Sequence, residues 1–407
     1  MSAKPHGRTR FADPMFAAIC ALGLGQITAW GTTYYCLGVL AASITAETGW
    51  SRSLVFFGFT IALLSMGAVS VWAGRLIDRH GARPVMLLGT LLSAVRSEAA
   101  YLAMWAFLGV GMRLSLYDAA FAALVQVAPT RGRMAISYLT LFGAFASTVF
   151  WVIGHYLNEA FGWRQTLVAF AAIHLAVCLP LNAYGLAWRE AGDHAATPAE
   201  KSRSARERPP LAGRARVLAL ALFALVMSLN GFIFGVVSVH LVPMLQAAGL
   251  TAAVAVWVAS LKGFAQFSGR VVEIFCGSRL RAITVGRIAI GVLPLSFFVL
   301  LLAGGDLVAI VTFTLVMGAA QGVITIVRGA VPLALFGRDG YGTVLGLIAT
   351  PVVIVNATAP TIFALIVDRW GWQAAELALL GLATASWIAM ELMSRWYERQ
   401  HAAPGKT

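Results

Sequence analysis

Long apolar runs, separated by short polar stretches, make up almost the whole of this 407-residue chain. A helix needs about 20 apolar residues to cross a hydrocarbon core of about 30 Å, and runs of this kind recur along the whole sequence. We interpret twelve of them as membrane-spanning helices. The predicted spans are residues 15–43, 52–74, 84–95, 99–127, 134–157, 165–187, 216–245, 249–273, 283–303, 307–335, 342–366 and 373–395.

A polar segment in the middle of the chain divides these spans into two sets of six. It is rich in Arg, Glu, Ser, Ala and Pro and has too few apolar side chains to build a core. We therefore expect a linker there. The predicted organisation is an N-terminal tail (1–14), an N-terminal six-helix half (15–187), the linker (188–216), a C-terminal six-helix half (217–395) and a C-terminal tail (396–407).

The third span is shorter than the others. Only Pro84 to Val95 is free of charged residues before Arg96 and Glu98. Twelve helical residues rise about 18 Å, which is well short of the membrane core. We expect this helix to be unusually short, with local distortion around it. The alternative is that the membrane accommodates Arg96 and Glu98 as a pair.

The composition supports a membrane protein. Hydrophobic residues make up 59% of the chain and charged residues only 12%, and the mean hydropathy is +0.81. This excludes most soluble enzymes, which bury a core with fewer apolar residues. The formal net charge is +13, but the basic residues lie in loops between the spans, which argues against nucleic-acid binding. Because arginines concentrate on the side of the termini and the linker, we expect both termini in the cytoplasm and a location in the plasma (bacterial inner) membrane.

No motif for a metal, a cofactor or a nucleotide is present in the sequence. The four cysteines and seven histidines are scattered, with no CxxC or HExxH spacing and no phosphate-binding loop of the ATPase type. We therefore expect a protein that is not an enzyme, with no cofactor and no metal. The expected partners are a small-molecule substrate, protons and the lipid bilayer, without nucleic acid, and we expect a monomer.

The two halves of the chain repeat one another. The stretch from Gly74 to Arg83 after the second span returns as Gly269 to Arg279 after the eighth, and a Gly-Trp pair at 162–163 returns at 371–372. The fourth and tenth spans also align, with Gly111 to Asp118 against Gly322 to Gly329. Such repeats are typical of transporters whose related halves surround a central site.

The first copy of the repeat resembles the loop signature of the major facilitator superfamily, Gly-x-x-x-Asp-Arg-x-Gly-x-Arg followed by a further basic residue. This chain supplies Gly74, Asp78, Arg79, Gly81 and Arg83, with Pro84 at the last position. The resemblance covers essentially the whole chain. It implies an all-α membrane fold of two six-helix halves related by a pseudo-twofold axis, and secondary transport by alternating access.

A finer resemblance is to bacterial members related to monocarboxylate transporters. It rests on the runs Tyr35-Cys-Leu-Gly38 and Gly49-Trp50-Ser51-Arg52. Of the opening motif of that group, this chain has only Trp30-Gly31.

The signature loop (Gly74, Arg75, Asp78, Arg79, Gly81 and Arg83) is our candidate for a gate. Asp78 can bond either to the N-terminus of a neighbouring helix or to an arginine of the next loop, such as Arg131 or Arg133. Bonds of this kind would hold the cytoplasmic side closed and break when it opens. The alternative is an ordinary basic cytoplasmic loop.

We single out four ionisable residues inside the predicted spans: Arg113, Asp118, Lys262 and Arg328. A charge at the centre of a membrane helix costs about 2.5–3.5 kcal/mol on insertion scales, so each is a candidate functional residue. Arg113 and Asp118 are about 140° apart on one helix and are not expected to pair. The repeat instead predicts a pair between Asp118 and Arg328 across the two halves.

Three cations against one carboxylate favour an organic anion as the substrate, because arginine can bind a carboxylate through two hydrogen bonds. Asp118 is the candidate for proton coupling. A proton-driven multidrug or metabolite exporter is the alternative function, and a transporter-like receptor without flux is a further one. The candidate substrate-binding residues are Tyr34, Tyr35, Arg113, Lys262, Gln266, Arg328, Asn230 and Asn356.

Overall fold

The computed structural model of the protein describes residues 14–80, 97–188, 210–276 and 279–402. Every regular element in these ranges is a helix. The predicted third span (84–95), the signature residues Gly81 and Arg83 and most of the predicted linker lie outside the described residues.

The N-terminal half consists of helices that are interrupted inside several of the predicted spans. A π-helical turn, Trp30–Tyr34, separates α1 from α2, and a second one, His174–Cys178, precedes α10. The α-helices are α1 (Pro14–Ala29), α2 (Cys36–Thr48), α3 (Arg52–Ala68), α4 (Ser70–His80), α6 (Glu98–Ser115), α7 (Tyr117–Val127), α8 (Gly132–Gly143), α9 (Ala146–Ile173) and α10 (Leu179–Gly185). Short 3₁₀ turns cover Pro129–Arg131 and Leu186–Trp188.

The C-terminal half is built from longer, more continuous helices. They are α13 (Gly213–Ala247), α14 (Ala252–Cys276), α15 (Ala282–Leu302), α16 (Leu307–Phe336) and α17 (Tyr341–Ala402). Their bounds lie within a few residues of the spans expected from the sequence, except that α17 joins the last two of them.

The repeated Gly-Trp pair marks a sharp break in each half. Gly162 inside α9 and Gly371 inside α17 have positive φ angles of 76° and 81° and non-helical ψ angles of 168° and 173°. Glycine accepts this backbone conformation without steric cost. The 62 residues of α17 would extend about 93 Å as one straight helix, three times the thickness of a membrane core. Each break therefore separates two crossings.

Seven helical stretches in the described residues are long and apolar enough to cross a membrane, and an eighth is added if the bent pair α3–α4 forms one span. Two of the seven contain the breaks at Gly162 and Gly371 and so supply two crossings each. The predicted total of twelve stays a prediction, because the third span lies outside the described residues and α14, which covers the predicted eighth span, is not among these stretches.

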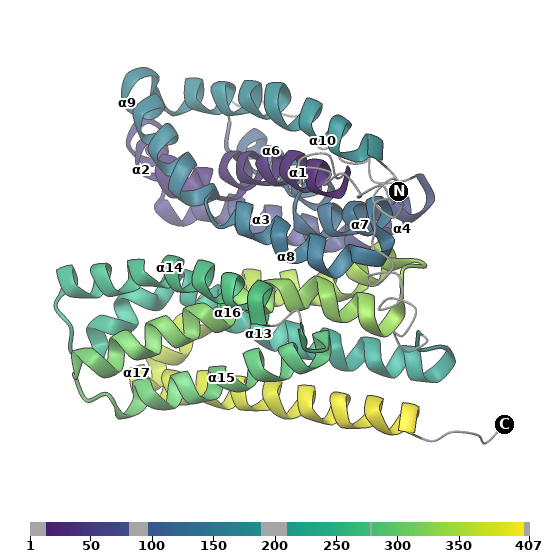
Figure 1. The fold of residues 1–407 in the computed structure, drawn as a ribbon. Coiled ribbons are helices and arrows are strands. Elements are labelled where there is room, and N and C mark those ends of the chain that lie inside the picture. Colours follow the sequence, from purple (N-terminus) through teal and green to yellow (C-terminus); the bar gives the residue numbers. More distant parts are fainter. Residues whose placement is uncertain (1–13, 81–96, 189–209, 277–278, 403–407) are drawn as a thin grey trace, which may run out of the picture.

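The helices form two bundles that lie side by side, α1–α10 above and α13–α17 below in Figure 1. All run roughly parallel to one long direction. α10 ends, α13 begins and α17 ends on the right in this view, and we call this the linker end. The opposite end, on the left, is called the far end.

Three clusters of buried apolar side chains stabilise the bundle. The cluster at the linker end combines both halves, with Phe121 and Ile136 from one and Val331 and Tyr341 from the other. Toward the far end each half has its own cluster, and the one in the N-terminal half also includes Val353 and Ala357 of α17. The common core of the two halves is therefore largest at the linker end.

Small residues allow α4 and α17 to touch at the linker end. A Cβ atom built on Gly74 would overlap the carbonyl oxygen of Gly342, and one on Gly346 would overlap that of Ser70. One turn further along, the Thr350 hydroxyl donates to the carbonyl of Gly67 at 3.1 Å. This close approach depends on the absence of side chains, as at other small-residue contacts in membranes.

Candidate functional site

Arg113 and Asp118 face each other across a break in the fourth span. α6 ends at Ser115, and Leu116 has an extended backbone conformation (φ −82°, ψ −168°) before α7 begins at Tyr117. The break turns the following residues, so that Arg113 Nη1 donates a hydrogen bond to Asp118 Oδ2. Our expectation that these side chains would not pair was wrong, because it assumed an uninterrupted helix. Both are buried, with 2% and 4% exposure.

Arg328 of α16 reaches the same carboxylate from the other half. Its Nη2 atom donates to Asp118 Oδ2 at 2.6 Å, which is the pair that the repeat predicts. The Arg328 side chain is 26% exposed, against 3% for that of Asp118. The three residues, which we call the central cluster, carry a formal net charge of +1 in an environment that screens charge weakly.

The hydrogen-bonding capacity of the central cluster is only partly used. Arg113 Nη2 lies 3.5 Å from the carbonyl oxygen of Ser70. Arg113 Nε and Asp118 Oδ1 are buried and have no hydrogen-bond partner in the described part of the chain. Unpaired buried polar atoms are costly and are found where a further group binds or a strained state is held.

Aromatic side chains of the first and fourth spans border the central cluster. The ring of Trp30 lies 5.0 Å from those of Tyr34 and Tyr117. Trp30 Nε1 donates to Gln26 at 3.2 Å, and Gln26 donates to the carbonyl of Ser115 at 2.7 Å, beside the helix break. A small cavity at this place is bounded by Trp30, Met66, Met112, Arg113, Leu116, Tyr117, Asp118 and Arg328.

Lys262 and Gln266 lie on α14, away from the central cluster. Lys262 Nζ is 5.4 Å from the centre of the Phe234 ring, a distance typical of a cation–π contact. Gln266 donates to Gln321 of α16 at 3.4 Å. Among the described contacts, no carboxylate pairs with Lys262.

The remaining candidates for substrate binding have other neighbours. The Tyr35 ring packs 6.3 Å from that of Trp151. Asn230 donates to Ser386 at 2.6 Å and Asn356 to the carbonyl of Gly231 at 3.1 Å. The structure therefore uses both asparagines to join helices of the C-terminal half and does not bring them to the central cluster.

Asp78 of the signature loop binds the start of a helix in the other half. Its carboxylate accepts hydrogen bonds from the backbone N–H groups of Gly342 and Thr343 at 2.8 and 2.7 Å, and from the Thr343 hydroxyl at 2.5 Å. These residues begin α17. Of the two partners expected from the sequence, the structure has the helix N-terminus, and Arg133 binds elsewhere. Arg75 and Arg79 are exposed.

Glu273 and Arg270 are two buried residues between the halves that the sequence analysis did not single out. Glu273 accepts hydrogen bonds from Arg133 at 3.0 Å and Ser137 at 2.8 Å. Arg270 donates to the carbonyl of Thr140 at 2.8 Å. The signal was present in the repeat, because Glu273 stands four residues after Gly269 as Asp78 stands four after Gly74.

The arrangement is suited to binding. Two guanidinium groups, a carboxylate, one phenol (Tyr117) and an indole surround the cavity, together with two methionines and a leucine. Within the described residues, no three His, Cys, Asp or Glu side chains lie close enough to hold a metal ion.

Comparison with known families settles the class of this protein. Residues 22–311 match the family model described as Major Facilitator Superfamily, and this is most of the chain. The chain belongs to this superfamily. It is therefore a multi-pass membrane transporter and not an enzyme, which confirms the predicted family and fold class. The resemblance to monocarboxylate transporters stays a prediction.

Curated relatives match a part of the chain. Multidrug resistance protein MdtL of Shewanella oneidensis is 28% identical over 173 residues, or 40% of this chain and 43% of that protein. The protein of the same name from Escherichia fergusonii is 27% identical over 197 residues, or 46% of this chain and 49% of that protein. The matched stretch thus spans less than half the length of these relatives.

Solved structures match over nearly the whole chain at low identity. The human organic anion transporter MFSD10 (TETRAN) is 18% identical with a TM-score of 0.71, covering 93% of this chain and 99% of that one. The proton:xylose symporter XylE bound to 6-bromo-6-deoxy-D-glucose is 13% identical with a TM-score of 0.72, covering 92% and 95%. At these identities the likeness shows the fold alone.

Proposed function

We propose that this transporter moves a small organic anion and that Arg328 is the residue that receives it. The proposal rests on one observation: a single carboxylate oxygen of Asp118 accepts hydrogen bonds from both Arg113 and Arg328. One carboxylate neutralises one guanidinium group, so a positive charge is left over. The partly exposed Arg328 can turn to a substrate carboxylate while Arg113 stays paired with Asp118.

The same arrangement supports our proposal of proton coupling. Protonation of Asp118 weakens its bond to Arg328, because the bond loses its ionic character. Arg328 is then free to take the anion. When the proton leaves Asp118, the carboxylate again competes for Arg328 and the anion is released. A proton and a carboxylate would thus move in the same direction.

The contacts between the halves support alternating access. The hydrogen bonds and ion pairs that join described residues of the two halves lie between the linker end and the level of Arg328. We infer that this conformation is closed at the linker end and that opening requires the Asp78 and Glu273 contacts to break. Exposed Arg75, Arg79 and Arg338 at this end support a cytoplasmic orientation by the positive-inside rule. The conformation would then be closed to the cytoplasm.

A second candidate is a proton-driven exporter of amphiphilic compounds. Two observations favour it: the matched relatives are named multidrug resistance proteins, and Trp30, Tyr34 and Tyr117 present aromatic faces next to the central cluster. Aromatic faces attract organic cations as well as apolar rings.

Transport measurements in proteoliposomes separate these candidates. We expect uptake of labelled lactate, or of another small carboxylate, to be stimulated by an inward proton gradient. Arg328→Ala should lower this uptake by about tenfold or more, the effect of losing one charged hydrogen bond of 1.5–3 kcal/mol, and Arg328→Lys should restore part of it.

The control is Arg287→Ala, which removes an arginine that pairs with Glu391 inside the C-terminal half at 2.7 Å. It should leave uptake unchanged. Undiminished anion uptake in Arg328→Ala and in Lys262→Ala would rule out the proposed site. Proton-driven efflux of a fluorescent cation, without carboxylate uptake, would select the exporter instead. Binding of a carboxylate without counterflow would indicate a receptor.

A further inference from the structure

Gln26 is a buried polar residue of the first span to which the proposed transport mechanism gives no part. It lies on α1 and is 1% exposed. A side-chain amide in such a place is costly unless its hydrogen-bonding groups find partners. Gln26 has two of them: its Nε2 atom donates to the carbonyl of Ser115 at 2.7 Å, and its Oε1 atom accepts from Trp30 Nε1 at 3.2 Å.

These two partners allow the amide group only one orientation. The indole N–H of Trp30 can only donate, so it must face the amide oxygen, and the carbonyl of Ser115 can only accept, so it must face the amide nitrogen. Trp30 lines the cavity at the central cluster, and Ser115 is the last residue of α6 before the break in the fourth span. The Gln26 side chain therefore links the break to the wall of the cavity.

The bond to Ser115 satisfies a carbonyl that the break deprives of its helical partner. In a continuous helix this carbonyl would accept from the N–H group of Ala119. Here Ala119 and Ala120 both donate to the carbonyl of Leu116, each at 3.1 Å. Because a buried carbonyl without a donor is costly, the break depends on a donor from another helix, and Gln26 supplies it.

The tenth span shows the same stretch of the repeat without a break. When Gly111 is aligned with Gly322, residues 115 and 116 correspond to Ile326 and Val327. Both of these lie inside α16, which is helical from Leu307 to Phe336. The break is therefore a property of the N-terminal half and not of the repeat.

The residue that corresponds to Gln26 in the seventh span is Asn230. The count runs back five positions from the glycines at 31 and 235, each of which would collide with the fifth or the eleventh span if it carried a Cβ atom. The amide nitrogen of Asn230 donates to the carbonyl of Val226 and to Ser386 of α17. Both of its N–H groups are thus used, and the tenth span receives no donor from it.

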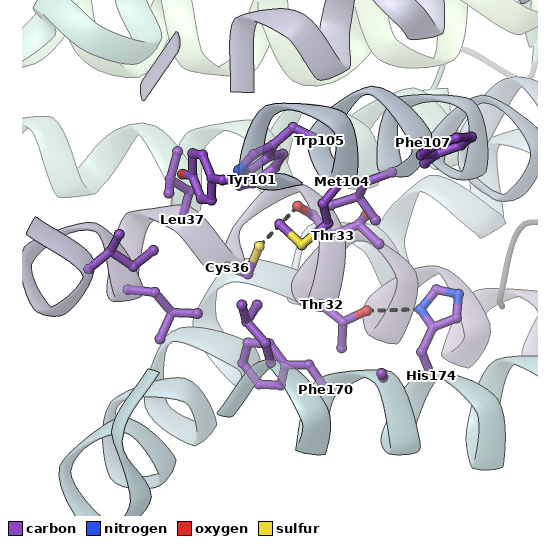
Figure 2. A pocket seen from close by; sticks show the side chains of 15 residues that line it. Thr32, Thr33, Cys36, Leu37, Tyr101, Met104, Trp105, Phe107, Phe170 and His174 are labelled. Carbon is purple, nitrogen blue, oxygen red and sulfur yellow. Dashed lines mark hydrogen bonds between the residues drawn. The ribbon is translucent and has the colours of Figure 1, made fainter. Parts of the chain in front are cut away.

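The first span is anchored on both sides of Gln26. Cys178 Sγ donates to the carbonyl of Gly25 at 3.3 Å. The hydroxyl of Thr32 contacts His174 Nδ1 at 2.9 Å, as Figure 2 shows. His174 and Cys178 are the two ends of the π-helical turn in the sixth span. A side chain that holds a neighbouring helix in place needs a fixed base of this kind.

We propose that Gln26 is a positioning residue, which holds the break in the fourth span open and so keeps Arg113 on Asp118. In a continuous helix these two side chains would lie about 140° apart, whereas across the break they form a hydrogen bond. Arg113 then neutralises Asp118 and leaves Arg328 for the substrate. This last step rests on the proposed function, but the hold on the break does not.

A double-mutant cycle on thermal unfolding in detergent tests the hold on the break. Gln26→Met keeps the length of the side chain and removes both hydrogen bonds, so it should lower the unfolding temperature. Asp118→Asn removes the charge that favours the break. The fourth span can then continue as a helix, with Ala119 donating to Ser115. In that background we expect the loss caused by Gln26→Met to fall to roughly half or less.

Asn158→Leu is the matched control. Asn158 of α9 donates to Ser43 of α2 at 2.7 Å, so it also joins two helices of the N-terminal half through an amide group. Its effect on the unfolding temperature should be the same with and without Asp118→Asn. An equally constant effect of Gln26→Met would overturn the proposal. If Gln26→Met does not fold, Gln26→Ala takes its place in the cycle.

Uptake kinetics test the consequence for the substrate. Without the hold on the break, Asp118 loses Arg113 and draws Arg328 away from the anion. Gln26→Met should therefore raise KM for a labelled carboxylate about fivefold, the effect of one lost hydrogen bond, with little change in Vmax. Gln26→His, which keeps an N–H donor at a similar reach, should restore part of the affinity.

The two measurements separate this proposal from the proposed function. Uptake by the unmodified protein with an unchanged KM in Gln26→Met would show that Gln26 does not position the binding site. A complete lack of carboxylate uptake by the unmodified protein would overturn the proposed function, and the thermal cycle would still decide whether Gln26 holds the break.

Discussion

Replacing Asp78 with alanine should shift the protein toward a conformation that is open at the linker end. The substitution removes an acceptor of three hydrogen bonds, from Gly342 N, Thr343 N and the Thr343 hydroxyl, at 2.5–2.8 Å. These bonds join the halves and are lost on opening, when water replaces them. A helix-capping side chain contributes about 1–2 kcal/mol and a hydrogen bond to a charged group about 1.5–3 kcal/mol. We take about 2 kcal/mol for the whole contact, which corresponds to an equilibrium shift of about 30-fold.

The shift can be measured as a distance distribution by double electron–electron resonance. Spin labels at Met134 and Arg338, which are exposed on opposite halves at the linker end, report its opening. In Asp78→Ala we expect a longer distance to become the major component. Asp78→Asn retains an acceptor, and because asparagine caps helices about as well as aspartate, it should produce a smaller shift.

The matched control is Glu391→Ala. Glu391 accepts two hydrogen bonds from Arg287 at 2.7 and 2.8 Å, and both residues belong to the C-terminal half. Its loss should lower stability without changing the distance distribution. Identical distributions in Asp78→Ala and in the unmodified protein would show that the Asp78 contact does not hold the linker end closed.

Three further outcomes are expected. Asp118→Asn should lower the thermal unfolding temperature in detergent more than Arg328→Ala does, because it leaves Arg113 buried without a counter-charge at a cost of about 3–5 kcal/mol; equal losses would contradict this. Gly74→Leu should prevent closure of the linker end and abolish transport, whereas Gly263→Leu, at a position with no neighbouring atom within 4 Å, should transport normally. Glu273→Ala should increase alkylation of a cysteine placed at Ser137, and an unchanged alkylation rate would show that the Glu273 contact is not part of the closure.

The helical organisation was predictable because the membrane imposes it. A span must be apolar and about 20 residues long, and both properties are visible in the sequence. The pairing of Asp118 with Arg328 was predictable for a related reason, since the repeat brings the fourth and tenth spans to equivalent inner positions.

The contacts that the sequence did not reveal depend on local breaks in the backbone. The extended residue Leu116 brings Arg113 to Asp118, and nothing in the residues around it requires the helix to stop. The choice of partner for Asp78 and Arg133 depends on how the halves pack at the linker end. That packing is fixed by the shapes of several helices together and not by any one segment.

The two acidic side chains at the linker end show how the repeat has diverged. Asp78 and Glu273 hold matching positions, and each contacts a residue in the first turn of a helix in the opposite half. Counted from the breaks in α9 and α17, Gly342 at the start of α17 corresponds to Arg133 at the start of α8. A side chain on Gly342 would collide with the Asp78 carboxylate, so glycine permits a direct bond to the backbone there.

At the matching place in the other half, Arg133 binds Glu273 through its charged side chain, whereas Gly342 binds Asp78 through its backbone N–H group. The longer Glu273 meets this side chain, which is 25% exposed. The two contacts therefore respond differently to their surroundings. The contact of Asp78 with the start of α17 consists of short hydrogen bonds, two of them from backbone groups in fixed positions. The ion pair between Glu273 and Arg133 is partly exposed, so salt screens it. In the proposed closure of the linker end, we therefore expect the Asp78 contact to vary little with salt and the Arg133–Glu273 contact to weaken as salt rises.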